Sequence, residues 1–371
     1  MGKSRNISQV LNDQGLIEAA DLAPGVGTPE QGFNFRNRII NGDMRIDQRN
    51  AGAAITVNST GTFFPVDRFF GSGQATDGVF TLQQSSTAPS GFVNSVIATV
   101  TTADASIGAT QFYLFNQYIE GTNVADLAWG TASAKTVTLS FWVRSSLTGT
   151  FGGVISNSAQ NRSYPFTYTI SAANTYEYKT VTIAGDTSGT WLTTTGIGIR
   201  LHFDLGVGST YRGTAGSWAG ATYLGATGAT NVIGTLNATW YITGVQLEVG
   251  SVATPFERRD YGTELNRCQR YFVSLSQPRL RGVGDGTNFQ RMGISLPVTM
   301  RASPTVSLSG TITVYNGSAT GTGTSVDVSY STADSVELDI IKASGTSTAG
   351  TPSVAYITAS NTSVVTGSSE L

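Results

Sequence analysis

The chain has 371 residues and a formal net charge of −2, and 39% of its residues are hydrophobic while 12% are charged. The charged share is about half of that usual in soluble proteins, and 44 glycines supply many turns. This composition is typical of an all-β protein with room for two or three domains. It provides no basic surface for nucleic acid or anionic lipid.

Cysteine and histidine each occur once, as Cys268 and His202. An internal disulfide and a Cys/His zinc cluster are therefore excluded. The chain has no apolar run near 18 residues, and its first residues lack the apolar centre of a signal peptide. We therefore expect a protein made in a cytoplasm, without membrane insertion and without a nucleic-acid partner.

Residues 1–35 differ from the rest of the chain. Ile7, Val10 and Leu11 are spaced as one face of a short helix, and an extended segment follows them. A helix of about two turns is unstable alone and must dock on something. We interpret residues 1–35 as an attachment arm, with a frayed terminus as the alternative.

Residues 36–260 contain repeated strand patterns separated by turn signals. Ile39 and Ile40 are expected to begin a strand before an Asn41-Gly42 turn, and Pro65 indicates an edge strand or strand start. Strict alternation of apolar and polar residues predicts further strands at 135–146, 196–208 and 239–250. Residues 111–121 fit either a strand or a helix. Residues 206–234 show no period and are expected to form a long loop. The pattern predicts a jelly-roll β-sandwich.

A cluster of charged residues separates the first β region from the rest of the chain. Residues 261–273 are expected to form a connector, with a helical turn over 264–271. Residues 274–371 contain about six short alternating stretches, which predict a smaller C-terminal β-sandwich. The expected fold class is therefore all-β, with two sandwiches behind a short N-terminal helix and arm.

Both ends of the first β region carry recognisable sequence motifs. "RIINGDMRIDQR" opens it, "VDR" follows, and "GVQLEVGSVATPFE" with "RCQRY" closes it. This bracket resembles phage and prophage tail-fibre-like virion proteins that carry a carbohydrate-binding-module-like jelly roll. The matching residues are Asn41, Gly42, Asp43, Met44, Gln48, Arg49, Val66, Asp67, Arg68, Gly244, Val245, Gln246, Leu247, Glu248, Pro255, Phe256, Glu257, Cys268, Gln269 and Arg270.

The bracket also concentrates charge at the two ends of the jelly roll, which are expected to lie side by side. We expect charged residues of the opening end to pair with those of the closing end, as a structural junction. These residues are Arg45, Asp47, Arg49, Asp67 and Arg68 against Glu248, Glu257, Arg258 and Arg259. A contact between chains is a second, compatible interpretation, because the resemblance implies a homotrimer and arginine suits interfaces.

The sequence offers no convincing catalytic constellation, and we expect no enzyme. His202 has no Ser or Cys motif near it, Cys268 is expected to be a buried apolar residue, and no long repeat typical of depolymerising tailspikes is present. No cofactor is expected. A structural calcium is possible if four carboxylates converge, namely Asp43, Asp47, Asp67 and Glu248.

Sugar binding usually needs aromatic platforms and polar side chains. Trp142 and Trp240 lie in alternating strands and are expected in the core. The candidate ligand residues are instead Tyr211, Trp218 and Tyr223 in the glycine-rich loop, and Arg279, Arg281, Asp285 and Asn288 in the last domain. For Trp218 the alternative is a plug at the end of the sandwich.

The expected function is that of a bacteriophage tail fibre or structural virion protein, contributing to binding of a host-surface glycan. The N-terminal arm would contact other virion proteins, and the protein would reside in the virion, in its tail. A head-decoration or neck fibre with a purely structural role is the alternative, since fold does not fix function. An isolated bacterial carbohydrate-binding module fits less well, because an attachment arm is expected.

Overall fold

The computed structural model describes residues 35–58, 60–74, 77–276, 280–284, 289–309, 312–315, 320–342, 352–356 and 364–371. The expected attachment helix, with Ile7, Val10 and Leu11, lies outside these ranges. Within them the structure contains no helix long and apolar enough to cross a membrane.

The chain divides into two compact units. The first comprises the described residues up to Arg45, then Gly52–Pro65 and Phe69–Arg258. The second comprises Arg259–Leu371 together with two short earlier segments, Ile46–Ala51 and Val66–Arg68. The division lies at Arg258, and the two early segments of the second unit fall within the range 36–260 that the sequence predicts for the jelly roll.

The first unit is built from two six-stranded antiparallel sheets. One sheet has the order β1-β4-β5-β14-β7-β10. Its strands are β1 (Ile55–Val57), β4 (Val79–Ser85), β5 (Ser95–Thr102), β14 (Thr239–Val249), β7 (Val137–Ser145) and β10 (Glu177–Ile183). The alternating patterns at 135–146 and 239–250 are thus confirmed as β7 and β14.

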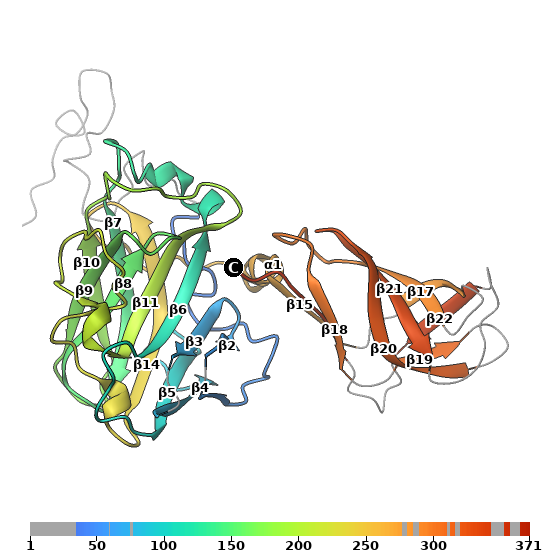
Figure 1. Cartoon of the computed structure of the whole chain (residues 1–371), viewed down its shortest axis with the longest axis horizontal. Coiled ribbons are helices and arrows are strands. Elements are labelled where there is room, and N and C mark those ends of the chain that lie inside the picture. The colour runs from blue at the N-terminus through green and yellow to red at the C-terminus, as the bar shows by residue number, and fades with distance from the viewer. Residues whose placement is uncertain are drawn as a thin grey trace, which may run out of the picture. The chain divides into compact units, whose positions relative to one another are not determined.

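The second sheet has the order β2-β3-β6-β11-β8-β9. Figure 1 shows the sheets as two layers, with β6 and β11 in front of β14. Pro65 lies in the edge strand, as expected, and the segment 111–121 contains a strand, β6, and not a helix. The strands are β2 (Phe63–Val66), β3 (Phe69–Gly73), β6 (Phe112–Glu120), β11 (Ile197–Val207), β8 (Gly149–Ser156) and β9 (Ser163–Ile170), and two 3-10 turns, η3 (Gly121–Asn123) and η4 (Ala125–Leu127), follow β6.

The core between the sheets is rich in aromatic side chains. Trp240 is fully buried, with its ring centroid 5.7 Å from those of Phe115 and Phe203. Its indole N–H donates to the Tyr168 hydroxyl at 3.1 Å, so the one polar atom of the ring is satisfied. The expected all-β jelly-roll class is confirmed, as is the core position of Trp240.

The opening stretch differs from its prediction. Residues 35–45 form no strand, although Ile39 and Ile40 are buried. Arg38 N–H donates to the Leu247 carbonyl, and Val245 N–H donates to the Gly42 carbonyl, so the stretch lies against β14. Its backbone turns at Asn41, with φ of 59°, which breaks the repetitive geometry a strand requires.

Amide and carboxylate groups hold this opening stretch in place. The Asn37 side chain donates to the Val245 carbonyl at 3.0 Å and accepts from Leu247 N–H at 3.0 Å. The Glu257 carboxylate accepts from the backbone N–H groups of Arg36 and Asn37. The two ends of the jelly roll are therefore adjacent, as expected, and hydrogen bonds to backbone groups join them.

A long segment after β11 is mostly loop, as its lack of period predicted. It contains η5 (Ser209–Tyr211), η6 (Val232–Gly234) and a two-residue parallel pair, β12 (Arg212–Gly213) with β13 (Gly225–Ala226). The Arg212 guanidinium ties the loop together by donating to the carbonyls of Val207 at 2.6 Å and Ala229 at 2.9 Å, and to the Asn231 side chain.

The C-terminal segment of the second unit opens with α1 (Tyr261–Gln269), which confirms the expected helical turn. Asp260 caps this helix by accepting from Thr263 N–H at 2.9 Å. A three-stranded sheet follows, with β23 (Val364–Ser368) between β15 (Phe272–Ser276) and β18 (Thr305–Ser309).

The other strands of this unit close into a barrel, in place of the two facing sheets that the sequence predicts. Its order is β16-β17-β21-β20-β19-β22. The register of β20 shifts twice, and such bulges increase the twist and bend that closure requires. The strands are β16 (Leu280–Gly284), β17 (Phe289–Ser295), β19 (Ile312–Tyr315), β20 (Thr320–Ser331), β21 (Ser335–Lys342) and β22 (Pro352–Tyr356).

The second unit also holds a cluster of ion pairs. Arg49 contacts Asp67 at 3.0 Å and Glu370 at 2.8 Å, and Arg68 pairs with Glu370. Arg68 and Arg49 also stack on the rings of Tyr271 and Phe272, 3.5 and 3.6 Å from the centroids. The expected partners of these arginines, Glu248 and Glu257, belong to the other unit.

Candidate ligand-binding groove

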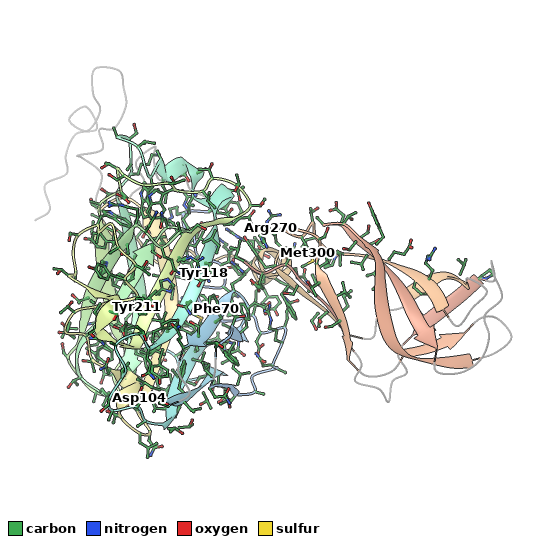
Figure 2. All side chains as sticks on the ribbon, viewed as in Figure 1. Phe70, Asp104, Tyr118, Tyr211, Arg270 and Met300 are labelled. Carbon is green, nitrogen blue, oxygen red and sulfur yellow. The ribbon has the colours of Figure 1, made fainter. Side chains whose placement is uncertain are left out.

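A groove of about 540 Å³ lies over the second sheet of the first unit. Strands β3, β6 and β11 form its floor, and the loop after β11 forms one wall. Figure 2 labels three of its aromatic residues, Phe70, Tyr118 and Tyr211, on the same face of this unit. The lining residues are Thr60, Gly61, Thr62, Phe70, Ser72, Gly73, Gln74, Phe112, Leu114, Tyr118, Gln160, His202, Tyr211, Thr222 and Leu224.

The aromatic rings of the groove brace one another. Phe70 and Tyr118 pack edge to face at 4.9 Å and 84°, and Phe112 and Tyr211 do so at 6.2 Å and 76°. The Arg200 guanidinium lies 4.3 Å from the Tyr118 ring. Rings held in this way keep their orientation before a ligand arrives, which reduces the entropy lost on binding.

One buried polar atom lines the floor. His202 is 1% exposed, and its Nε2 has no hydrogen-bond partner among the residues that the structure describes. Its Nδ1 lies 2.6 Å from the Asn116 amide oxygen, while the Asn116 nitrogen donates to the Phe70 carbonyl and the Ser72 hydroxyl. Because the Asn116 oxygen accepts, Nδ1 carries the proton, and Nε2 is left as an acceptor.

Burial lowers the pKa of His202 to about 3, and the nearby Arg200 charge acts in the same direction. The imidazole is therefore neutral at physiological pH. A buried acceptor without a protein partner is the kind of group that a ligand hydroxyl satisfies.

Beneath the loop wall lies a second buried group, Asp204. Its carboxylate is fully buried, and Arg212 is 3.6 Å away. Burial raises the pKa of Asp204 to about 7, although the Arg212 charge opposes this. Gly225 leaves room for the carboxylate, since a Cβ there would lie 2.3 Å from Oδ2. Asp204 thus supports the loop from below without entering the groove.

The structure separates the three loop aromatics that the sequence singled out. Tyr211 lies in the groove. Trp218 packs with Trp129 and Trp191, at 5.4 Å from each, and its N–H donates to the Ala184 carbonyl at 2.7 Å. This placement favours the alternative, a packing role. The Tyr223 ring lies over Gly213, where a Cβ would be 2.3 Å from it.

The predicted residues of the last domain have little structural description. Arg279, Asp285 and Asn288 lie outside the described residues, and Arg281 is placed in β16 without a described side chain. Their ligand role stays a prediction.

The four carboxylates proposed for calcium do not converge. Asp43 pairs with Arg45 at 2.5 Å, and Asp67 pairs with Arg49. Asp47 accepts from the N–H groups of residues 49 and 50, and Glu248 accepts from Thr254. In the part of the chain that the structure describes, no group of three His, Cys, Asp or Glu side chains is arranged to hold a metal ion.

Sequence reasoning missed most of the groove. The sequence assigns no ligand role to Phe70, Tyr118 or His202, and it leaves the segment that contains Tyr118 as a strand or a helix. Alternation along β6 and β11 does distinguish the two faces, and a partly polar outer face with aromatics was the available signal. What alternation cannot supply is the pairing of β3, β6 and β11, which places these side chains side by side.

No protein-family model and no curated protein matches this chain. Solved structures with partial similarity include the enzymatically active domain of tailspike protein 4 from bacteriophage CBA120, at 12% identity and a TM-score of 0.31. That match covers 58% of this chain and 22% of the tailspike chain.

Two carbohydrate-binding modules are also similar. TmCBM61, solved with β-1,4-galactotriose, is 10% identical with a TM-score of 0.28, covering 58% of this chain and all of the module. The family 11 module of Clostridium thermocellum, solved with a mixed-linked tetrasaccharide, is 13% identical with a TM-score of 0.27, covering 56% of this chain and all of the module. At these scores, function is inferred from the chain's own groove.

Proposed function

We propose that this chain is a non-enzymatic virion protein, a bacteriophage tail fibre, whose first unit binds a glycan in the groove over β3, β6 and β11. The observation that carries the proposal is the combination of braced rings, Phe70, Tyr118 and Tyr211, with the unpartnered Nε2 of His202. Rings stack on the C–H faces of sugars, and the acceptor receives a hydroxyl proton.

The chemistry of the groove favours a neutral glycan. Among the described residues, those that line it are uncharged at neutral pH, and Thr60, Thr62, Ser72, Gln74 and Gln160 add polar groups. The nearby Arg200 guanidinium is engaged in stacking on Tyr118 and donates to the Ser158 carbonyl. A carboxylated or phosphorylated sugar would therefore lose water without gaining an opposite charge from the residues that line the groove. We therefore expect uncharged oligosaccharides to bind in preference to acidic ones.

The virion role rests on the sequence bracket that resembles tail-fibre-like proteins. In this proposal the protein is a homotrimer, residues 1–35 attach it to other virion proteins, and several weak sites act together. Avidity of this kind raises affinity by about 10² to 10⁴ without new contacts.

The test is binding of the purified full-length chain to an array of neutral and acidic bacterial surface oligosaccharides, with calorimetry on the best neutral one. Tyr118→Ala should weaken neutral-glycan binding about tenfold, because stacking on one ring is lost. Tyr330→Ala, a 64% exposed tyrosine of the second unit, is the matched control and should bind as the parent does.

If the Tyr118→Ala variant binds the neutral glycan as tightly as the parent chain does, the groove is not the glycan-binding site. A folded chain that binds no glycan, and that labels capsids rather than tails in electron microscopy, would instead support a structural head-decoration or neck role.

A further inference from the structure

A second hollow, of about 500 Å³, lies on the first sheet of the same unit. It is lined by Ser90, Phe92, Trp142, Tyr178, Ala253, Thr254, Pro255, Phe256 and Arg258. Its volume is within the range of about 300–1,000 Å³ typical of small-molecule sites. The expectation that Trp142 belongs to the core is wrong, since this ring lines the hollow and is half-buried.

The floor of the hollow is a cross-strand aromatic pair. Trp142 of β7 and Tyr178 of β10 are direct partners in the antiparallel register, with ring centroids 5.4 Å apart. Tyr178 is 43% exposed, and β10 is the edge strand of its sheet. Two large rings on an open sheet edge form a platform rather than part of a core.

A bulge in β14 shapes one side of the hollow. The register of β14 against β7 shifts between Thr243 and Gln246, and Gly244 has φ of 64°. A Cβ at Gly244 would lie 2.7 Å from the Phe92 ring and 3.1 Å from the Trp142 ring. The glycine therefore lets Phe92 close in beside Trp142, and Phe256 packs edge to face on Phe92 at 5.2 Å. Bulges are frequent next to binding sites.

A positive charge stands at the rim. The Arg258 guanidinium lies 4.7 Å from the Phe92 ring centroid, its Nη2 donates to the Gly91 carbonyl, and the residue is exposed. The neighbouring Glu257 carboxylate accepts from two backbone N–H groups, at Arg36 and Asn37. A stacked arginine keeps further in-plane donors for a carboxylate.

We propose that this hollow is a second saccharide site, specific for a carboxylated sugar such as a uronic acid. The sugar ring stacks on Trp142, its carboxylate pairs with Arg258, and the Ser90 hydroxyl is within the same hollow. The charged rim distinguishes this site from the uncharged groove, and the inference does not depend on glycan binding in that groove.

The experiment compares trigalacturonic acid with its methyl-esterified form, which lacks the charge, by calorimetry on the full-length chain. We expect the acid to bind, and Arg258→Gln to weaken that binding about tenfold, since a charge-assisted pair is lost. The esterified form should bind more weakly and be insensitive to the substitution.

Arg144→Gln is the matched control. Arg144 is on the same strand as Trp142 and stacks on Tyr241 at 4.9 Å, and it is not among the residues that line the hollow. This variant should bind the acid as the parent does. Since Arg258 is exposed, the Arg258→Gln variant is expected to fold, which a thermal melt confirms.

Two results would overturn the inference. One is acid binding that survives Arg258→Gln but is lost in Tyr118→Ala, which would assign the acid to the groove. The other is no acid binding at all, with sedimentation showing an oligomer that Tyr178→Ala dissociates, which would make the hollow a contact between copies. Neutral-glycan binding, measured on the same variants, reports separately on the groove.

Discussion

His202 illustrates how a single hydrogen bond sets the chemistry of a site. Asn116 fixes the proton on Nδ1, so Nε2 is an acceptor. Since burial lowers the pKa of His202 to about 3, the ring does not gain a proton under ordinary conditions.

Neutral-glycan affinity should therefore change less than about twofold between about pH 5 and about pH 8, because His202 stays neutral throughout. Calorimetric titrations across this range measure it. A steep loss of affinity below about pH 6.5, the ordinary pKa of histidine, would show that the imidazole titrates normally and is not buried as described.

The buried Asp204 carboxyl, in contrast, should make the stability of the first unit depend on pH. Its pKa is about 7 in the folded chain and 3.8 in the unfolded one, so the folded chain holds the proton to higher pH. The free energy of unfolding should fall as pH rises from about 4 to about 7, and be level above that. We expect the first unit to melt several degrees higher at about pH 5 than at about pH 8.

Asp204→Asn is the variant that isolates this effect. It keeps the shape and removes the buried charge, so the pH dependence of the first-unit melting temperature should largely disappear. A melting curve for Asp204→Asn that still falls between these pH values would assign the dependence to another group.

Glycine is required at position 42 because there is no room for a Cβ. A Cβ there would lie 2.2 Å from the Val245 carbonyl oxygen. Gly42→Ala should lower the free energy of unfolding of the first unit by about 1–3 kcal/mol, measured by denaturant titration, because the backbone must move. Gly293→Ala is the control, because a Cβ there would meet nothing within 4 Å. This substitution should carry no steric cost in the free energy of unfolding.

Among the elements, the loop after β11 is the one on which the groove depends. Arg212 joins its two ends through carbonyl acceptors, and Leu224 of the loop packs with Leu114 and Val207 of the sheet. The loop wall thus has its own small apolar core, with Tyr211 and Phe112 packed against it.

Arg212→Ala should loosen this wall. We expect neutral-glycan affinity to fall about three- to tenfold, because Tyr211 must then be ordered on binding. Hydrogen exchange of loop amides is the direct measurement, and faster exchange should be confined to the loop. Unchanged exchange with unchanged affinity would show that the apolar contacts alone hold the wall.

The elements also show how far sequence reasoning reaches. Alternation located β7, β11 and β14, because buried and exposed positions alternate along a half-buried strand. It failed at residues 38–44, where Ile39 and Ile40 are buried in irregular backbone. Composition also could not distinguish a barrel from a sandwich, since both need the same short alternating strands.

The candidate sites were harder still. Tyr211 was found because an aromatic residue in a glycine-rich loop stands out. The prediction that Trp142 lies in the core is wrong, since a tryptophan in an alternating strand has the same pattern whether it faces the core or an open hollow. The Gly244 bulge turns that face into a platform, and a bulge leaves little trace in residue pattern.

At the scale of the whole molecule, the two units should unfold separately, and the ion-pair cluster belongs to the second. Glu370→Gln removes the partner of Arg49 and Arg68. We expect it to destabilise the second unit by about 3 kcal/mol, because the buried Arg68 loses the carboxylate with which it pairs, whereas Arg49 keeps its contact with Asp67. Calorimetry with a transition for each unit measures this.

The control for Glu370→Gln is Glu337→Gln in the same unit. Glu337 pairs with Arg291 at 3.2 Å, but both side chains are more than 40% exposed. An exposed pair of this kind contributes about 1 kcal/mol or less. Equal effects of the two substitutions, or a shift confined to the first unit, would contradict the assignment of the cluster.

The ion-pair cluster has a consequence for biosynthesis. Arg68 and Glu370 are 302 residues apart in the chain, and Arg49 and Glu370 are 321 apart. At about 5–20 residues per second, a ribosome needs on the order of 15–60 seconds to make the intervening chain. During that interval the early segments are exposed without their partners. Arginine and aspartate side chains remain hydrated in this state, whereas apolar side chains at the same positions would promote aggregation. Charged side chains in the ion-pair cluster therefore suit a contact that forms only at the end of synthesis.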